Sequence, residues 1–183
     1  MNPRREKAKR QIIFGLVVLI ITGGLYWYGH RAPAITSFAQ CAAKGYSVME
    51  SYPRQCRTPQ GKIFKEDIGN ELEKDNLIRI SEPRPNAIIQ SPLLVKGMAR
   101  GSWFFEASFP IRLFDGSGEM MAKGMATANP PAGGEWMTTD FVPFEAILSF
   151  TLPTTTSGTL LLERDNPSGL PENTDALRIP IRF

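Results

Sequence analysis

Residues 109–118, FPIRLFDGSG, carry the clearest strand and turn signal in the chain. Ile111 and Leu113 alternate with Arg112, which is the pattern of a half-buried β-strand with one apolar face. Residues 115–118, Asp-Gly-Ser-Gly, follow at once and have the chemistry of a tight turn. An alternating strand that ends in such a turn predicts an antiparallel partner immediately downstream.

The same arrangement of short apolar runs and turn residues continues across residues 78–183, which show no convincing helical periodicity. The predicted strands are Ile78–Ile80, Ala87–Ile89, Leu93–Ala99, Phe105–Phe114, Met120–Ala128, Phe144–Leu152, Thr159–Arg164 and Leu177–Arg182. We therefore predict a mainly β fold, an immunoglobulin-like antiparallel β-sandwich. The Cys…Trp…Cys pattern is missing, so the predicted sandwich has no internal disulfide.

The N-terminus has a basic tip followed by an uncharged apolar run, Ile12–Tyr28. The run reaches about 25 Å as a helix, the short end of what crosses a bilayer. Basic residues stay on the cytoplasmic side, so residues 1–30 predict a cytoplasmic tip with one transmembrane helix, and the rest is extracytoplasmic. The alternative is a cleaved secretory signal ending near Ala32–Ala34. Aromatic residues at 26–28 favour retention.

The charge of the chain is unevenly distributed. It holds 21 Lys and Arg against 18 Asp and Glu, with a pI near 9.0. Residues 1–30 contain five of the basic and one of the acidic residues, which leaves the remainder at a net charge of −1. The exported part therefore lacks the basic footprint of a nucleic-acid-binding protein.

Residues 31–66 form a small cysteine-containing segment, and the polar residues 67–77 have the composition of a linker. Outside the cytoplasm, Cys41 and Cys56 predict a disulfide, with two free thiols as the alternative. Too few His and Cys ligands lie nearby for zinc. Ser37 and Gln40 predict a capped helical turn that ends at Gly45. Two short strands, residues 46–52 and 62–65, are predicted to form a hairpin.

Several stretches of the β region together resemble the Gmad2 family, an immunoglobulin-like module of exported bacterial proteins associated with sporulation and germination. They are PRPNAIIQSPL at 83–93, VKGMA at 95–99, WFFEASFPI at 103–111, DGSG at 115–118, GTL at 158–160 and IPIRF at 179–183. The resemblance covers residues 80–183. It implies an extracytoplasmic binding or assembly role without assigned chemistry. The family's usual partner domain is replaced here by the cysteine segment.

Two aromatic sites are candidates for partner binding. Consecutive aromatics on one strand point to both faces, so the run Trp103, Phe104 and Phe105 predicts at least one exposed ring, unless a loop covers it. Trp136 follows a glycine-rich loop, where binding residues are common, although packing on the sandwich edge is the simpler interpretation. A third stretch, residues 165–175, carries oxygen ligands suited to calcium, but Asx turns explain it more simply.

No catalytic arrangement is predicted. The single histidine, His30, lies at the membrane boundary, which excludes a Ser-His-Asp triad in the domain. We expect a non-enzymatic, membrane-tethered envelope module without a cofactor or metal, whose ligand is cell-wall glycan or an envelope protein. The alternatives are a protease inhibitor that presents Arg54 and an envelope enzyme of unrecognised type. The oligomeric state stays open.

Overall fold

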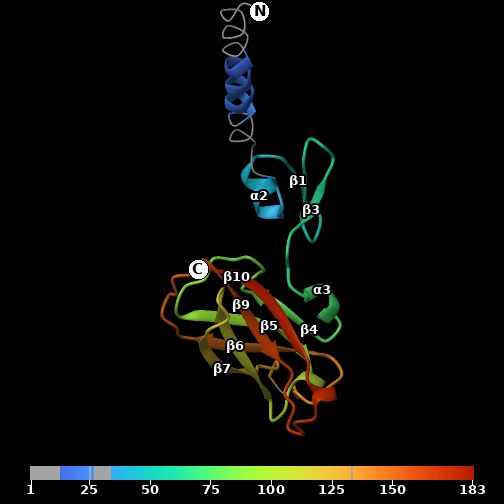
Figure 1. The fold of residues 1–183 in the computed structure, drawn as a ribbon. Helices are drawn as coiled ribbons and strands as arrows, with labels where there is room; N and C mark the ends of the chain where they lie inside the picture. Colours follow the sequence, from blue (N-terminus) through green and yellow to red (C-terminus); the bar gives the residue numbers. More distant parts are fainter. Residues whose placement is uncertain (1–12, 25, 27–33, 133) are drawn as a thin grey trace, which may run out of the picture.

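The computed structural model describes residues 13–24, 26, 34–132 and 134–183 (Figure 1). Residues 13–24 are helical, and the large apolar side chains of this helix are exposed. The predicted span at residues 12–28 lies partly outside the described residues, and the basic tip lies wholly outside them. Within the described part of the chain, no helix is both long enough and apolar enough to cross a membrane.

Residues 34–66, which we call the disulfide unit, fold as one helix packed on a three-stranded antiparallel sheet. The elements are α2, Phe38–Ala43; β1, Ser47–Met49; β2, Gln55–Arg57; and β3, Ile63–Lys65. The predicted cap of α2 is confirmed, because Ser37 Oγ accepts from the Gln40 amide at 3.2 Å. Gly45 follows the helix with φ of +73°, a conformation that glycine adopts without strain.

The predicted disulfide is confirmed: Cys41 on α2 is bonded to Cys56 on β2, with Cα atoms 6.0 Å apart. The predicted pairing of residues 46–52 with residues 62–65 is wrong, because β1 and β3 each pair with β2 and not with each other. Strand β2 lies between β1 and β3, so that Cys56 occupies the central strand and faces the helix. The chain leaves β1 already at Met49, because residues 50–54 turn toward the sandwich.

The predicted antiparallel sandwich is confirmed in the form of a near-barrel. Its strands are β4, Ile78–Glu82; β5, Leu93–Arg100; β6, Ser108–Asp115; β7, Met120–Ala128; β8, Phe141–Leu148; β9, Ser157–Glu163; and β10, Ala176–Arg182. The order across the sheet is β10-β9-β6-β7-β8-β5-β4. Only residues 127–128 of β7 pair with β8, so the sheet folds there into two layers. A bridge between Ile88 and Arg182 nearly closes the other side.

The core lies between the two layers. The alternation that predicted the fold holds, since Ile111 and Leu113 are 0% exposed and Arg112 points to solvent. Phe109 sits at the centre, with its ring 5.3 Å from that of Phe104 and 4.9 Å from that of Phe144. Burial of these apolar side chains is the main term that stabilises the sandwich.

Three strand predictions differ from the structure by more than two residues. The predicted strand Phe144–Leu152 is shifted, since β8 runs from Phe141 to Leu148. The predicted strand Phe105–Phe114 begins only at Ser108, because Glu106 and Ala107 form a tight turn with positive φ, which two backbone hydrogen bonds between Phe105 and Ser108 close. A 3₁₀ turn, η1, Gly101–Trp103, lies just upstream. The predicted strand Ala87–Ile89 is an isolated bridge to β10. Two short elements complete the fold: α3, Glu71–Lys74, and the 3₁₀ turn η2, Pro171–Asn173.

Candidate functional site

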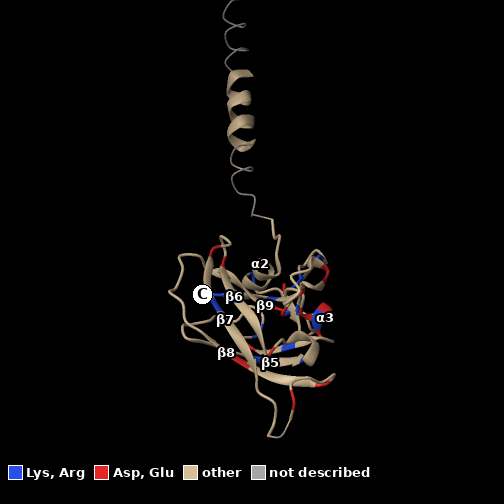
Figure 2. Ribbon diagram, turned by 90° about the horizontal axis from the view of Figure 1, so that it is seen from below, with Lys and Arg blue, Asp and Glu red and all other residues tan. Residues whose placement is uncertain are grey.

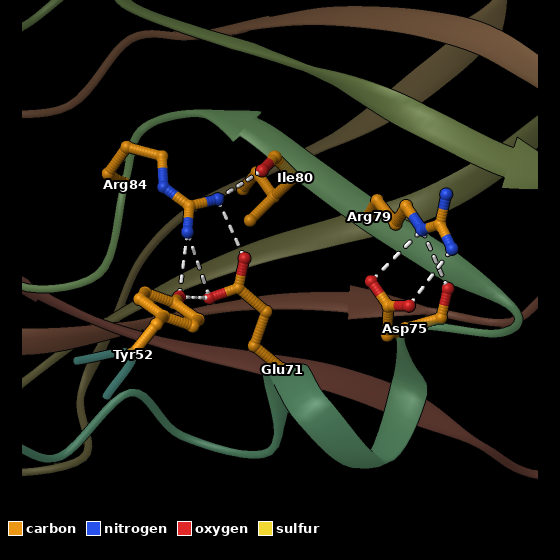
Figure 3. A network of polar contacts seen from close by, with 6 residues as sticks. All are labelled: Tyr52, Glu71, Asp75, Arg79, Ile80 and Arg84. Carbon is orange, nitrogen blue, oxygen red and sulfur yellow. Dashed lines mark hydrogen bonds and ion pairs between the residues drawn. The ribbon is translucent and has the colours of Figure 1, made fainter.

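The loop between β1 and β2 carries Tyr52 from the disulfide unit to helix α3 (Figure 3). The Tyr52 hydroxyl donates to Oε2 of Glu71. Arg84 donates to Oε1 of Glu71 at 2.7 Å and to the Tyr52 hydroxyl oxygen at 2.7 Å. It also donates to the carbonyl of Ile80 at 2.6 Å. One closed polar network therefore joins the disulfide unit, α3 and the sandwich.

Glu71 is 7% exposed, and a carboxylate at such a depth needs charged or hydrogen-bonding partners. Arg84 supplies the charge, and its guanidinium also lies 5.5 Å from the centre of the Tyr52 ring. Burial of the hydroxyl end, followed by the hydrogen bond and negative charge of Glu71, raises the pKa of Tyr52 to about 12. Tyr52 therefore stays a hydrogen-bond donor throughout the physiological pH range.

A second contact between the units is centred on Glu66, at the end of β3. Arg54 donates from Nε and Nη2 to the two Glu66 oxygens, at 2.8 and 2.6 Å. The hydrogen bond from Arg54 is the first cause that lowers the pKa of Glu66. From the sandwich side, Asn86 donates to Glu66 Oε1 at 3.4 Å and to the Asp67 carbonyl at 2.7 Å. The Arg54 guanidinium lies 5.4 Å from the Phe38 ring centre.

The predicted linker, residues 67–77, lies against β10. The Asn70 side chain accepts from the Arg178 amide at 2.7 Å and donates to the Ala176 carbonyl at 2.9 Å, as a strand neighbour would. Gly69 comes so close that a Cβ there would lie 1.8 Å from the Arg178 carbonyl oxygen. Ile68 is 6% exposed. These contacts fix the direction in which the chain enters the sandwich.

Between the disulfide unit and the sandwich lies a groove of about 550 Å³, which we call the junction groove. Its walls include Phe38, Arg54, Phe64, Lys65, Asn86 and Arg182, together with the acidic residues Glu66 and Asp67. Cavities of this size hold small organic groups. The groove therefore combines aromatic rings with cations, carboxylates and an amide, which can contact apolar faces and form hydrogen bonds. Among the described residues, no cluster of His, Cys, Asp and Glu is arranged to hold a metal ion.

The structure brings the predicted aromatic candidates together at one end of the sandwich, but mostly inside it. Trp103 and Phe104 are 1% and 6% exposed and belong to the core. Trp136 is half-buried and packs on the same core, while Phe105 is 44% exposed. The expected alternation of faces fails because residues 101–103 form a 3₁₀ turn rather than a strand.

In the acidic loop at residues 165–175, polar side chains satisfy one another. Asn166 donates to the Leu170 carbonyl at 2.8 Å, and the Ser168 hydroxyl donates to Asn166 Oδ1 at 2.6 Å. These are the short-range bonds of Asx-type turns, as the simpler sequence interpretation expected.

The sequence did not predict the polar contacts between the disulfide unit, α3 and the sandwich. Tyr52, Glu71 and Arg84 are separated by 19 and 13 residues along the chain and stand in a loop, a linker and a turn. One signal was present, because Arg84 and Asn86 occur in the Pro-Arg-Pro-Asn stretch that also carried the family resemblance. Nothing in the sequence showed which partners these two residues would take.

Comparison with known families gives one match. The model of Gmad2, described as the immunoglobulin-like domain of bacterial spore germination, matches residues 77–169. No curated protein and no solved structure shows a significant match to the chain. The matched range covers strands β4 to β9, and β10 completes the same sheet by pairing with β9. Because the match spans half of the sequence and the fold agrees with it, the chain belongs to the Gmad2 family of immunoglobulin-like domains of bacterial spore germination.

Proposed function

We propose that the protein is a non-enzymatic binding module of the bacterial cell envelope, with the disulfide unit and the sandwich outside the cytoplasm. Membership in the Gmad2 family supports a germination-related envelope role. We assign the ligand to the junction groove and take a cell-wall polymer as that ligand, with an envelope protein as the alternative.

The composition of the groove carries this proposal. Phe38 and Phe64 line the groove with rings of the kind that stack on sugars, although Arg54 and Lys62 already lie 5.4 and 4.7 Å from their ring centres. Lys65 and Arg182 offer cations for carboxylates. A cell-wall polymer presents both groups along one chain. The polar networks at Glu66 and Glu71 hold the two walls at a fixed spacing, which reduces the entropy lost on binding.

Two features support a tether at the membrane. The helix at residues 13–24 exposes its large apolar side chains all round, as a lipid-embedded helix does. The disulfide between Cys41 and Cys56 suits an oxidising compartment. Residues 12–28 would then lie in the bilayer, with the basic N-terminus in the cytoplasm.

The geometry offers little support for a protease inhibitor. An inhibitor must present a free guanidinium to the pocket of the enzyme, whereas Arg54 makes two hydrogen bonds with Glu66 and lies over Phe38. We therefore place Arg54 in the wall of the groove.

Retention of the full chain, solubilised in mild detergent, on purified cell-wall sacculi tests the proposal. We expect retention by the wild type and weaker retention by Lys65→Glu and by Phe38→Ala. Lys123→Glu, an exposed charge reversal on β7, is the matched control and should bind as the wild type does. Capture of one envelope protein instead, lost in the same two variants, would assign the groove to that alternative. A folded wild type that retains neither material contradicts the proposal.

A further inference from the structure

The two folded parts of the chain carry opposite net charge. Residues 34–66 contain five Lys and Arg against two Glu, a net charge of +3, whereas residues 67–183 contain ten basic and fifteen acidic residues, a net charge of −5. Because the two net charges nearly cancel, the total for the residues after the N-terminal segment does not show this difference. Figure 2 colours the charged residues along the ribbon.

Within the disulfide unit, the acidic residues are confined to one end. Both of its acidic residues, Glu50 and Glu66, lie at the end that meets the sandwich, where they line the hollow around Tyr52. In the antiparallel sheet the opposite end holds the register row Ser47, Arg57 and Ile63. In Figure 1 the turn between β2 and β3 points away from the sandwich, on the side where the N-terminal helix lies.

This far end holds Arg57, Lys62 and Ile63, and Lys44 at the end of α2 precedes Ser47 by three residues; we call these four residues the basic end. The three cations are exposed, and no described acidic side chain lies within ion-pair distance of them. Ile63 is 43% exposed and stands beside Arg57 in the sheet register. The Lys62 ammonium lies 4.7 Å from the centre of the Phe64 ring. Cations without a carboxylate partner around an exposed apolar side chain are the composition of a surface that contacts anionic lipid.

The length of the chain places this end within reach of the bilayer. Ten residue steps separate Gly24, the last residue of the described helical run, from Ala34, the first of the disulfide unit. Even fully extended, ten residues span only about 36 Å. A helix held in the membrane thus keeps the basic end near the headgroups, and the acidic sandwich is repelled from the same surface.

We propose that Lys44, Arg57, Lys62 and Ile63 dock on the anionic phospholipid headgroups of the membrane that holds the chain. This inference rests on the tether in the proposed function. With the disulfide unit docked on the membrane surface, the sandwich points away from that surface. The ligand-binding part of the protein then has a fixed orientation rather than swinging on a free segment.

The test uses the full chain in vesicles of phosphatidylcholine alone or of an equimolar mixture with phosphatidylglycerol. A fluorescent amino acid replaces Gln60, which lies in the exposed β2–β3 turn, and headgroup-labelled lipid quenches it. We expect stronger quenching in the anionic vesicles and loss of the difference at high salt. Each of Lys44→Gln, Arg57→Gln and Lys62→Gln should weaken the contact about fivefold, and the triple variant roughly a hundredfold.

A charge-matched triple variant on the sandwich, with Lys96, Lys123 and Arg178 each changed to Gln, is the control and should quench as the wild type does. Equal quenching in both lipids, or an equal loss in the control, would overturn the proposal. The proposal would also be overturned if soluble polyphosphate bound through the three cations while the lipid composition had no effect on the quenching. Flotation with neutral vesicles tests the tether separately. A chain that fails to float there lacks the tether, and the comparison of lipids still decides whether the basic end binds.

Discussion

The disulfide unit and the sandwich hold their shapes by different physical means. In residues 34–66 only Cys41, Cys56 and Thr58 are buried, so the helix and the small sheet depend on the covalent bond between them. The sandwich buries a continuous core that includes Trp103 and Phe109. A segment too small to exclude water from a core is stabilised by a cross-link and by a larger neighbour.

The largest effect should come from the core of the sandwich. Phe109→Ala removes a ring that is 0% exposed and touches two other aromatic rings. We expect a loss of about 3–5 kcal/mol in the free energy of unfolding, because the side chain leaves a cavity. Urea unfolding followed by fluorescence measures it. Phe105→Ala, at a half-exposed ring, should change the same quantity by no more than about 0.5 kcal/mol.

Removal of the cross-link should affect the other region. The double variant Cys41→Ser and Cys56→Ser reopens a 15-residue loop, which corresponds to about 3 kcal/mol in the chain-entropy account. Amide exchange should become fast across residues 34–66 and stay slow in β6 and β9. Equal acceleration in those core strands would show that the two regions unfold as one.

The polar junction should have a smaller effect. Arg84→Ala leaves the buried Glu71 carboxylate without its cation, and we expect about 1–2 kcal/mol of destabilisation, given that Arg84 is half exposed. Arg84→Lys restores the charge but not the paired hydrogen bonds, so it should recover only part of this loss. Unfolding of each variant in urea gives the values. If Arg84→Ala left the free energy of unfolding unchanged, the contacts among Tyr52, Glu71 and Arg84 would orient the two units without stabilising them.

The smallest effect should be the pH dependence of Tyr52. Its pKa is raised from 10.0 to about 12 in the folded protein. The neutral Tyr52 hydroxyl, which donates to Glu71, therefore contributes its full stabilisation of the folded protein below pH 10. This contribution is lost as the pH rises through 12. Difference absorbance of tyrosinate between the wild type and Tyr52→Phe should show one residue titrating near pH 12. Titration near pH 10 would mean that the hydroxyl faces water.

The parts of the fold that follow local rules were predictable. The alternation around Ile111 and Leu113 placed β6, and Ser37 with Gln40 placed the start of α2, because both patterns act within a few residues. The exposed aromatics were predicted less well. Trp103 and Phe104 enter the core through a 3₁₀ turn, whose formation depends on the loop at Trp136 and Thr138 packing against Gly101.

Most strands of residues 78–183, the pairing of the two cysteines and the resemblance to the family could be predicted from the sequence. Each of these depends on residue type and spacing along the chain. The docking of residues 67–77 on β10, the link that Glu71 makes between Tyr52 and Arg84, and the position of Arg57 and Lys62 away from the sandwich become visible only in three dimensions. These contacts join residues that are distant in the chain. Which residues meet depends on how the disulfide unit packs on the sandwich, and local sequence patterns carry no information about that packing.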